Sequence, residues 1–373
     1  MEFGLFNSLY VPRELSEREP DAEHRRLMDE VAVVEAADRA GFKYTWATEH
    51  HFLTEYSHLS SNEVFLGYLA HATERIHLGS GIFNITPPVN HPARVAERVA
   101  MLDHLSGGRF EFGMGRGSST TEQLGFGIDD SDLTRDMFDE VVGQFRHMWR
   151  DEEYPGFDGK YFSMPARNVL PKPYTKPHPP MWVAAGSPST FEKAGRMGLG
   201  VLCFTMFGPE PLKPLIETYK RALEDAEPVG DFVNDNVMVT TQMLCLEDGQ
   251  RVRDLAGSGR LSQGYQNSLV FRYLDTFPKP PEIPTWPELI PEPTPEDIEM
   301  RIAGRVAMYG TPEEVGRAAQ AYADAGADQV VFGLLSSTLP RDLAIETIET
   351  FGTHVLPQFD RDPVHRTTRQ REA

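Results

Sequence analysis

Apolar and polar residues follow two different periods along this chain. Short runs of mainly apolar residues predict β-strands, the first at 2–7 (EFGLFN), 44–49 (YTWATE), 75–83 (RIHLGSGIF) and 108–117 (GRFEFGMGRG). The segments between them carry apolar residues at three- and four-residue intervals, which predicts helices at 22–40, 61–73 and 91–106. Gly41 gives a C-cap signal after the first of these helices. Strand and helix therefore alternate from the start of the chain.

The alternation continues to the end of the sequence. Further strands are predicted at 181–186, 200–204, 236–246 and 327–335, and further helices at 131–150, 187–198, 209–226, 311–326 and 339–359. Thr311, Pro312 and Glu314 form a capping-box pattern at the start of one helix. Mostly hydrophobic strands between helices indicate a parallel sheet covered by helices. An open doubly wound sheet is one solution, but eight strands without a break in composition favour a closed (β/α)8 TIM barrel.

Three segments depart from the repeat. We expect a single α/β domain over residues 1–360, with insertions at about 152–180 and 247–310. The second insertion contains a proline-dense stretch at 278–297, and a connection of this length is typical of a lid, a binding loop or a disordered segment. The polar residues 361–373 predict a flexible, frayed tail.

Composition narrows the classes of function. The 373 residues carry a formal net charge of −20, which argues against nucleic-acid or anionic-membrane binding because both need a basic face. No run approaches the roughly 18 apolar residues of a membrane span, and the N-terminus lacks a signal-peptide pattern. Cys203 and Cys245 lie in apolar, strand-like settings and predict buried, reduced thiols. These features predict a soluble, cytoplasmic protein.

Polar and ionisable residues gather where the predicted strands end. In a barrel, the active site lies at the C-terminal ends of the strands. Four successive strand ends are rich in such residues or in glycine: 49–51 (EHH), 79–82 (GSGI), 113–118 (GMGRGS) and 185–187 (AGS). We expect these four ends to face one cavity.

Two of these ends suit a phosphate group. Arg116 and Ser118 follow one strand, where a cation and exposed backbone N–H groups would lie together. Gly186 and Ser187 precede a helix whose N-terminus favours anions, and Thr190 can aim its hydroxyl at the same oxygens. Together they predict a monophosphate clamp. The alternative is that Ser187 is an ordinary N-cap and Arg116 a salt-bridge partner.

Glu49, His50 and His51 allow several interpretations. A metal site would need three or four ligands at suitable spacing, and consecutive residues in a strand point to alternate faces. His50 as an acid–base or hydrogen-bonding group beside a cofactor is favoured, with a structural histidine as the alternative. Glu49 is costly to bury unpaired, so we expect it to accept hydrogen bonds or to lie beside the cofactor. We predict no metal.

In this order, the motifs resemble those of the bacterial luciferase-like flavin monooxygenases, which are similar to alkanal monooxygenase. The resemblance rests on TWATEHHF (45–52), on the EHH, S-G-G-R-F and G-x-G-R-G elements between residues 49 and 119, and on GSPSTFEKAGRMG (186–198). It returns at YGTPEEVGRAAQAYADAGADQVVFGL (309–334), which is similar to the closing repeat of that family.

The resemblance implies a barrel that binds FMN as dissociable FMNH2 supplied by a separate NAD(P)H:FMN reductase. O2 would form a C4a-peroxyflavin that oxygenates an aldehyde, a ketone or another small hydrophobic substrate. His50 matches the catalytic histidine, with Glu49 beside it. Arg116, Ser187 and Thr190 match phosphate contacts, and Gly81-Ile82 matches a non-proline cis peptide. Glu122 matches a carboxylate that supports the active-site loop at the interface of a homodimer.

The sequence also departs from the family pattern. Gly115 stands where luciferases carry a reactive cysteine, which argues against light emission. Gly186 replaces a family carboxylate, so one partner of the phosphate site is missing. Pro87 and Pro88 lengthen a loop that would reshape the substrate pocket. We expect an apolar lining from Phe6, Phe83, Met114, Phe204 and Met206. Two other functions stay open, a deazaflavin-dependent oxidoreductase on the same barrel and a non-catalytic flavin-binding relative.

Overall fold

The structure is a computed structural model of the 373-residue chain. It describes residues 1–11, 13–53, 56–117, 119–204, 208–256, 294–333 and 339–372. Ser118, Met206 and most of the 247–310 insertion therefore lie outside the described residues. The lid-like character of that insertion stays a prediction.

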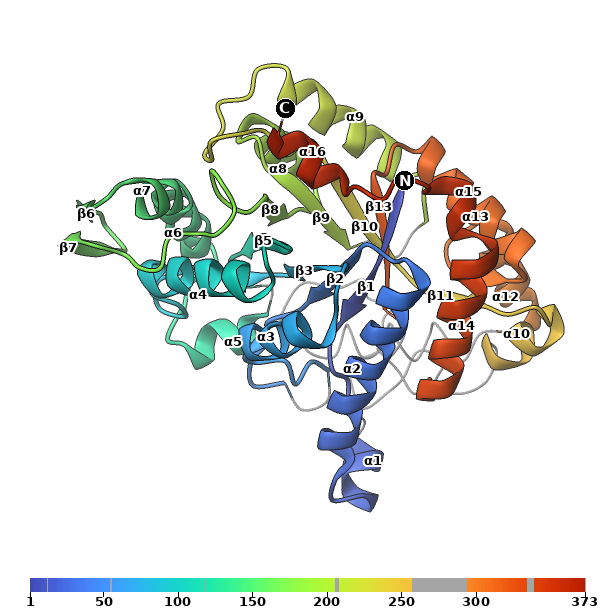
Figure 1. Ribbon diagram of the computed structural model, residues 1–373. Coiled ribbons are helices and arrows are strands. Elements are labelled where there is room, and N and C mark those ends of the chain that lie inside the picture. Colours follow the sequence, from blue (N-terminus) through green and yellow to red (C-terminus); the bar gives the residue numbers. More distant parts are fainter. Residues whose placement is uncertain are drawn as a thin grey trace.

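Eight parallel strands form a closed barrel (Figure 1). The neighbouring strands pair in chain order, and β13 pairs with β1 to complete the ring. The predicted (β/α)8 barrel is confirmed. Its strands are β1 (Glu2–Asn7), β2 (Tyr44–Ala47), β3 (His77–Ser80), β5 (Phe110–Gly115), β8 (Met181–Ala184), β9 (Gly200–Phe204), β10 (Val237–Thr241) and β13 (Gln329–Phe332).

Helices surround the strands (Figure 1). Gly41 ends α2 in the left-handed region at φ 93°, and Thr311 with Glu314 forms the predicted capping box of α13. The main helices are α2 (Ala22–Ala40), α3 (Asn62–Ala72), α4 (Pro92–Leu105), α6 (Leu133–Val142), α7 (Gln144–Arg150), α8 (Pro188–Arg196), α9 (Leu212–Leu223), α13 (Pro312–Asp324) and α14 (Arg341–His354). Shorter ones are α1 (Arg13–Arg18), α5 (Thr120–Gly125), α10 (Gly249–Ala256), α12 (Pro295–Ala303), α15 (Leu356–Phe359) and α16 (Arg366–Glu372). Among the described residues, no helix is both long enough and apolar enough to cross a bilayer.

Small strands lie outside the ring. An antiparallel hairpin of β6 (Tyr154–Asp158) and β7 (Ser163–Arg167) projects from one side, within the predicted 152–180 insertion (Figure 1). Short β4 (Phe83–Asn84) pairs with β5. The prediction of a single long strand at 236–246 is wrong, because β10 ends at Thr241 and the chain leaves the barrel there. Its second half, β11 (Met243–Cys245), pairs instead with β12 (Met308–Gly310).

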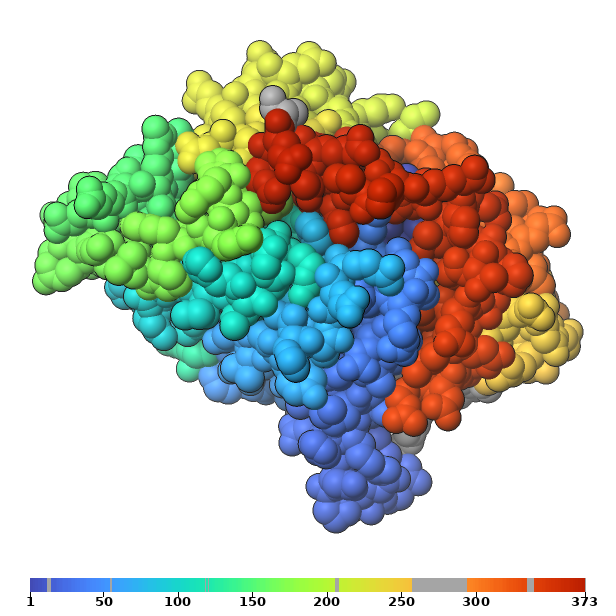
Figure 2. Space-filling view, in the orientation of Figure 1, coloured from blue at the N-terminus to red at the C-terminus, as the bar shows by residue number. Residues whose placement is uncertain are grey.

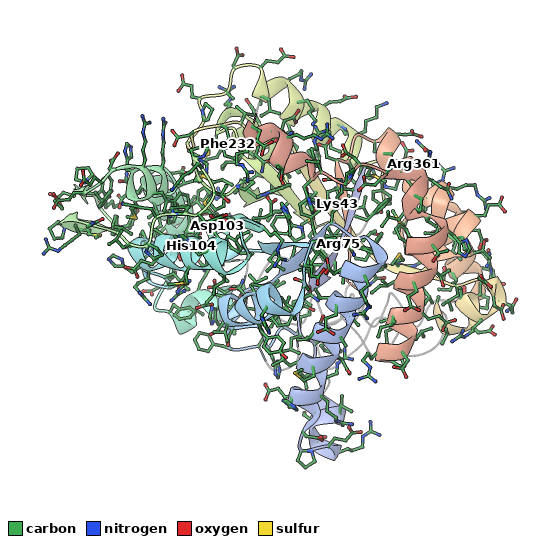
Figure 3. All side chains as sticks on the ribbon, in the orientation of Figure 1. Lys43, Arg75, Asp103, His104, Phe232 and Arg361 are labelled. Atoms are coloured by element: carbon green, nitrogen blue, oxygen red, sulfur yellow. The ribbon has the colours of Figure 1, made fainter. Side chains whose placement is uncertain are left out.

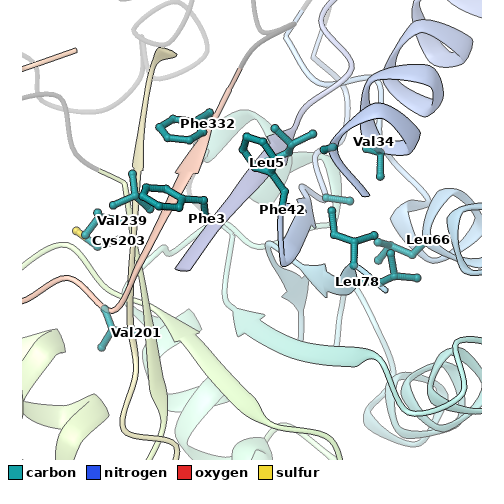
Figure 4. Close-up of a cluster of buried hydrophobic side chains, with 14 of the residues drawn as sticks. Phe3, Leu5, Val34, Phe42, Leu66, Leu78, Val201, Cys203, Val239 and Phe332 are labelled. Atoms are coloured by element: carbon teal, nitrogen blue, oxygen red, sulfur yellow. The ribbon is translucent and has the colours of Figure 1, made fainter. Parts of the chain in front are cut away.

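The hydrophobic core has two parts. One lies between strands and helices and includes Phe3, Phe42 and Phe332 (Figure 4). The other fills the barrel interior with Tyr44, Trp46, Trp182, Leu202, Met238 and Val331. The Trp46 ring is so close to β3 that a Cβ on Gly79 would lie 2.2 Å from it. Both cysteines are buried, as predicted, and burial raises the thiol pKa of each to about 12.

The C-terminal tail is not frayed, and that prediction is wrong. Residues 366–372 form α16, which lies across the end of the barrel where β1 begins (Figures 1 and 2). The buried Thr367 hydroxyl donates to Glu111 Oε1 at 2.6 Å inside the barrel. His365 stacks on His77 with ring centroids 3.6 Å apart. The tail is polar because its partners are polar, which composition alone cannot show.

A buried lysine joins the tail to this end of the barrel. Lys43 Nζ lies 2.7 Å from Glu2 Oε1 and 3.1 Å from Asp360 Oδ2, and it donates to the Val364 carbonyl at 3.0 Å (Figure 3 labels Lys43). Glu2 also accepts hydrogen bonds from the Tyr44 hydroxyl and the Arg366 backbone. The N-terminal end of the barrel is thus closed by a paired polar network.

Candidate active site

A cavity of about 790 Å³ opens at the C-terminal ends of the strands. Its lining includes almost every residue that the sequence singled out, contributed by separate strand ends. Glu122 lies behind this lining, in contact with His50. The predicted residues in the wall are Glu49, His50, Gly81, Ile82, Arg116, Gly186, Ser187 and Thr190.

One carboxylate holds the histidine loop from behind. Glu122 Oε1 lies 3.1 Å from His50 Nδ1 and accepts the His51 backbone N–H at 2.9 Å. Ser119 caps the short helix α5 that carries Glu122. Glu122 is 4% exposed, and its Oε2 has no hydrogen-bond partner among the residues that the structure describes. Contact between Glu122 and the loop agrees with the expected support role, whereas an interface role stays a prediction.

A second carboxylate is paired with the other histidine. Glu49 Oε1 lies 3.1 Å from His51 Nε2 and accepts from Asn90 Nδ2 at 2.9 Å. Glu49 Oε2 accepts the Asn84 backbone N–H at 3.2 Å. The buried carboxylate is therefore satisfied, as its burial required.

The loop with Pro87 and Pro88 contributes no side chain to the described cavity wall. It holds Asn90 against Glu49 instead, and Arg98 Nη1 donates to the Asn90 side chain at 2.8 Å. This loop thus contacts the site through Glu49 and does not border the pocket.

The two histidines turn toward different carboxylates and do not converge. His50 faces Glu122 and His51 faces Glu49. Across the described ranges, no group of three or more His, Cys, Asp or Glu side chains is arranged to hold a metal ion. This arrangement favours acid–base or positioning roles for the EHH sequence.

One part of the cavity wall carries hydroxyl and backbone N–H groups at a helix N-terminus, a setting that favours anions. Ser187 caps α8, and its Oγ lies 3.1 Å from Thr190 Oγ1. Thr190 Oγ1 accepts the backbone N–H groups of Gly186 at 3.1 Å and of Ser187 at 3.0 Å. These hydroxyls and N–H groups lie at the positive end of the helix dipole.

Cationic side chains also line the cavity. Arg116 lines the wall and donates to Thr134 Oγ1 at 2.7 Å, and burial, then the nearby Arg135 charge, lowers the Arg116 pKa. Arg135 and Lys193 also line the cavity and were missed from the sequence. Lys193 lies three residues after Thr190 on α8, so helical spacing could have found it, and it pairs with Asp139. Arg135 lies on α6 with no motif around it.

The apolar lining differs from the prediction. Phe6 and Phe204 line the cavity, together with Val183, Leu202 and Met238. Phe83 and Met114 do not, because both side chains are packed in the outer core between strands and helices. They lie on the other face of their strands, and the sequence does not show which face is inward. The Gly81-Ile82 peptide bond is cis, as the resemblance implied.

Comparison with known proteins decides the family. A family model described as luciferase-like monooxygenase matches residues 1–329. The chain belongs to the luciferase-like monooxygenase family. This is a family of flavin-dependent oxygenases, and the resemblance inferred from the EHH and GRGS motifs is confirmed.

Several curated relatives of this family member are named as monooxygenases. The alkanal monooxygenase alpha chain of the Kryptophanaron alfredi symbiont is 30% identical over 240 residues, 62% of this chain and 62% of that protein. The oxygenase component of a flavin-dependent trigonelline monooxygenase from Acinetobacter baylyi is 28% identical over 235 residues, 61% of each chain. Each match thus spans less than two thirds of the relative's length.

Solved structures share the barrel. Monooxygenase RslO1 from Streptomyces bottropensis has a TM-score of 0.78 and 25% identity, covering 96% of this chain and 100% of that one. The oxygenating constituent of 3,6-diketocamphane monooxygenase from Pseudomonas putida, solved with FMN, has a TM-score of 0.75 and 19% identity. The match covers 96% of this chain and 98% of that one. An F420-dependent secondary alcohol dehydrogenase has a TM-score of 0.68 and 18% identity. The match covers 96% of this chain and 99% of that one. The last two likenesses show the fold alone.

Proposed function

We propose that the protein is the oxygenase component of a two-component, FMN-dependent monooxygenase. It would take FMNH2 from a separate NAD(P)H:FMN reductase and use O2 to oxygenate a small, largely apolar substrate such as an aldehyde or ketone. One observation carries the proposal: a single cavity joins an anion-binding end to a wall that contains His50.

The anion end fits the phosphate of FMN. The Ser187 and Thr190 hydroxyls at the N-terminus of α8 supply donors, while Arg116 supplies a fixed charge. Such charge-assisted contacts are stronger than neutral ones, and they fix the orientation of the whole cofactor. Gly186 stands where the family pattern has a carboxylate, so the site lacks that partner. Arg135 and Lys193 also line the cavity and add positive charge.

His50 is the residue placed to handle a proton. Its Nδ1 faces Glu122 at 3.1 Å, so a proton exchanged with a ligand in the cavity would pass through Nε2. Glu122 fixes the orientation of the ring, and Glu49 fixes His51 and the loop after β3. When bound, the reduced flavin supplies the reaction with O2. The chain's own residues bind the phosphate, orient the ring system and hold the proton at His50.

The other walls favour an apolar substrate. Phe6, Val183, Leu202 and Met238 border the cavity, and a water-poor pocket suppresses side reactions of reactive intermediates. Gly115 provides no thiol beside the ring system, which favours oxygenation over light emission.

A deazaflavin-dependent oxidoreductase is the second candidate, because an F420-dependent enzyme shares the fold. Anaerobic titration with FMNH2 and with a reduced deazaflavin separates the two. Tight binding of FMNH2 supports the monooxygenase, and exclusive binding of the deazaflavin contradicts it. A non-catalytic flavin-binding role would require that His50→Ala leave turnover equal to wild type.

We also propose a homodimer. Val64 and Tyr68 on α3 and Met101 and Leu105 on α4 are exposed by 49–69% of their surface, and these helices pack together on the face seen in Figure 2. Exposed apolar side chains gathered on one face mark association surfaces. Sedimentation should give a dimer, and Tyr68→Glu should give a monomer.

A further inference from the structure

Ile82 and Gly115 are neighbours in the cavity wall. Ile82 follows β3 and Gly115 ends β5, and both line the cavity. Pairing of β4 with β5 sets Phe83 beside Met114 and Asn84 beside Gly115, which fixes the two positions relative to one another.

The two residues compete for one volume. A Cβ on Gly115 would lie 2.6 Å from Ile82 Cγ1 and 2.7 Å from its Cδ1. The Ile82 side chain therefore occupies the space that any side chain at position 115 would need. An isoleucine has few χ1 rotamers, so it would leave this space by swinging to a different well.

The direction of that swing is limited. On its inner side, Ile82 packs against the filled barrel interior, whose members include Trp46, Leu202 and Met238. Packed interiors do not accept an extra methylene without strain. The open side is the cavity that Ile82 lines. A larger residue at 115 would therefore push Ile82 into the cavity.

We propose that Gly115 is a positioning residue for cofactor binding, because it lets Ile82 withdraw from the cavity and keeps open the space for the cofactor ring system. The proposal rests on the proposed function, and it adds a second role for Gly115 besides the missing thiol. The side chains at positions 82 and 115 share one space in the cavity wall. The cavity keeps its width there only when their combined volume is small.

Gly113 provides a contrast. A Cβ there would lie 1.9 Å from the Ser80 carbonyl oxygen, so the obstacle is backbone. No side-chain change can relieve that contact. At Gly115 the obstacle is a side chain, so shortening Ile82 should relieve it. This difference makes the proposal testable by rescue.

The test is a double-mutant cycle with Gly115→Ala, Ile82→Ala and the double variant. The control is Gly143→Ala, because a Cβ there meets nothing within 4 Å. Dissociation constants for oxidised FMN are measured by flavin fluorescence, and denaturant midpoints are measured without cofactor. We expect Gly115→Ala to weaken FMN binding by about 10-fold or more. Adding Ile82→Ala should restore most of that loss, so the effects are not additive.

Two results would overturn the proposal. One is that Gly115→Ala binds FMN like wild type and Gly143→Ala. The other is that the double variant binds as weakly as the product of the single effects predicts. If the wild-type protein binds no FMN, the proposed function fails, and the denaturant midpoints then decide. If the midpoint shifts of the two single variants add up in the double variant, residues 82 and 115 do not compete for space. If Ile82→Ala restores the midpoint that Gly115→Ala lowers, they do.

Discussion

Oε1 of Glu122 lies 3.1 Å from Nδ1 of His50, so a carboxylate outside the cavity lining contacts a histidine within it. The same oxygen accepts the His51 backbone N–H at 2.9 Å. One buried atom thus fixes both the ring of His50 and the path of the loop that carries it. Under the proposed function Glu122 would be a positioning residue, because it would act on the reaction only through His50.

Removing Glu122 should therefore change catalysis more than cofactor binding. We expect Glu122→Ala to lower kcat by about 10- to 100-fold, less than the roughly 10²–10⁴-fold that loss of an acid–base group itself can cost. The Kd for FMN should stay near the wild-type value, and the pH profile of kcat should shift. Glu122→Gln keeps an oxygen acceptor, so its kcat should lie between those of wild type and Glu122→Ala. Equal losses in kcat and in FMN affinity would indicate a merely structural role.

The anion end predicts discrimination between FMN and riboflavin. Thr190→Val removes a hydroxyl that would contact phosphate, and a hydrogen bond to a charged group contributes about 1.5–3 kcal/mol, or roughly 10- to 100-fold in Kd. Riboflavin binding should be unchanged, because riboflavin lacks the phosphate. Thr218→Val on α9, where the hydroxyl donates to the Pro214 carbonyl, is the matched control. Equal losses of affinity for FMN and riboflavin would contradict a contact between Thr190 and the phosphate.

Glu111 predicts a loss of stability as pH rises. Burial raises its pKa to about 8 from the model-peptide value of 4.5, so the folded chain keeps a proton that the unfolded chain releases. This group's contribution is fully present below pH 4.5 and declines up to about pH 8. Glu111→Gln copies the neutral acid and should remove the decline. Unfolding midpoints of both proteins from pH 5 to about pH 8.5 check this; parallel curves would contradict it.

The stacked histidines His77 and His365 predict the opposite dependence, a loss of stability as pH falls below 6.5. Burial lowers the pKa of His77 to about 3 and of His365 to about 2, from 6.5. Their contribution is present above pH 6.5 and falls as pH drops toward these values, because the unfolded chain binds protons first. His365→Phe keeps the ring stack without a titrating group. Its free energy of unfolding should fall less than that of wild type between pH 6 and about pH 4.

Deleting residues 361–373 tests the role of α16. Glu111 would lose its Thr367 partner, and Lys43 would lose the Val364 carbonyl. Each buried group left without a partner costs about 1–3 kcal/mol, so the free energy of unfolding should fall by several kcal/mol. Arg369→Ala, at an exposed position on α16, should have little effect. A truncated chain as stable as wild type would show that the tail docks without consequence.

The barrel was predictable because its signal repeats. Each strand–helix unit must bury one face, so apolar spacing recurs around the ring. The site was predictable for a related reason, since strand ends such as those at His50, Arg116 and Ser187 converge on one side of any such barrel.

What the sequence did not reveal depends on pairing over long distances. Thr367 meets Glu111 across 256 positions, and a polar tail that docks looks like a polar tail that frays. Phe83 and Met114 were assigned to the cavity because spacing gives alternate faces without saying which is inward. Arg135 reaches the cavity from a helix without any motif.

The most direct measurement of the proposed function is rapid mixing of the anaerobic protein–FMNH2 complex with isotopically labelled O2 and an aldehyde or ketone. Wild-type protein should yield product containing one labelled oxygen atom, and His50→Ala should bind FMNH2 but form far less product. Unlabelled product, or hydride transfer with a deazaflavin and no oxygen consumed, would contradict the proposed function.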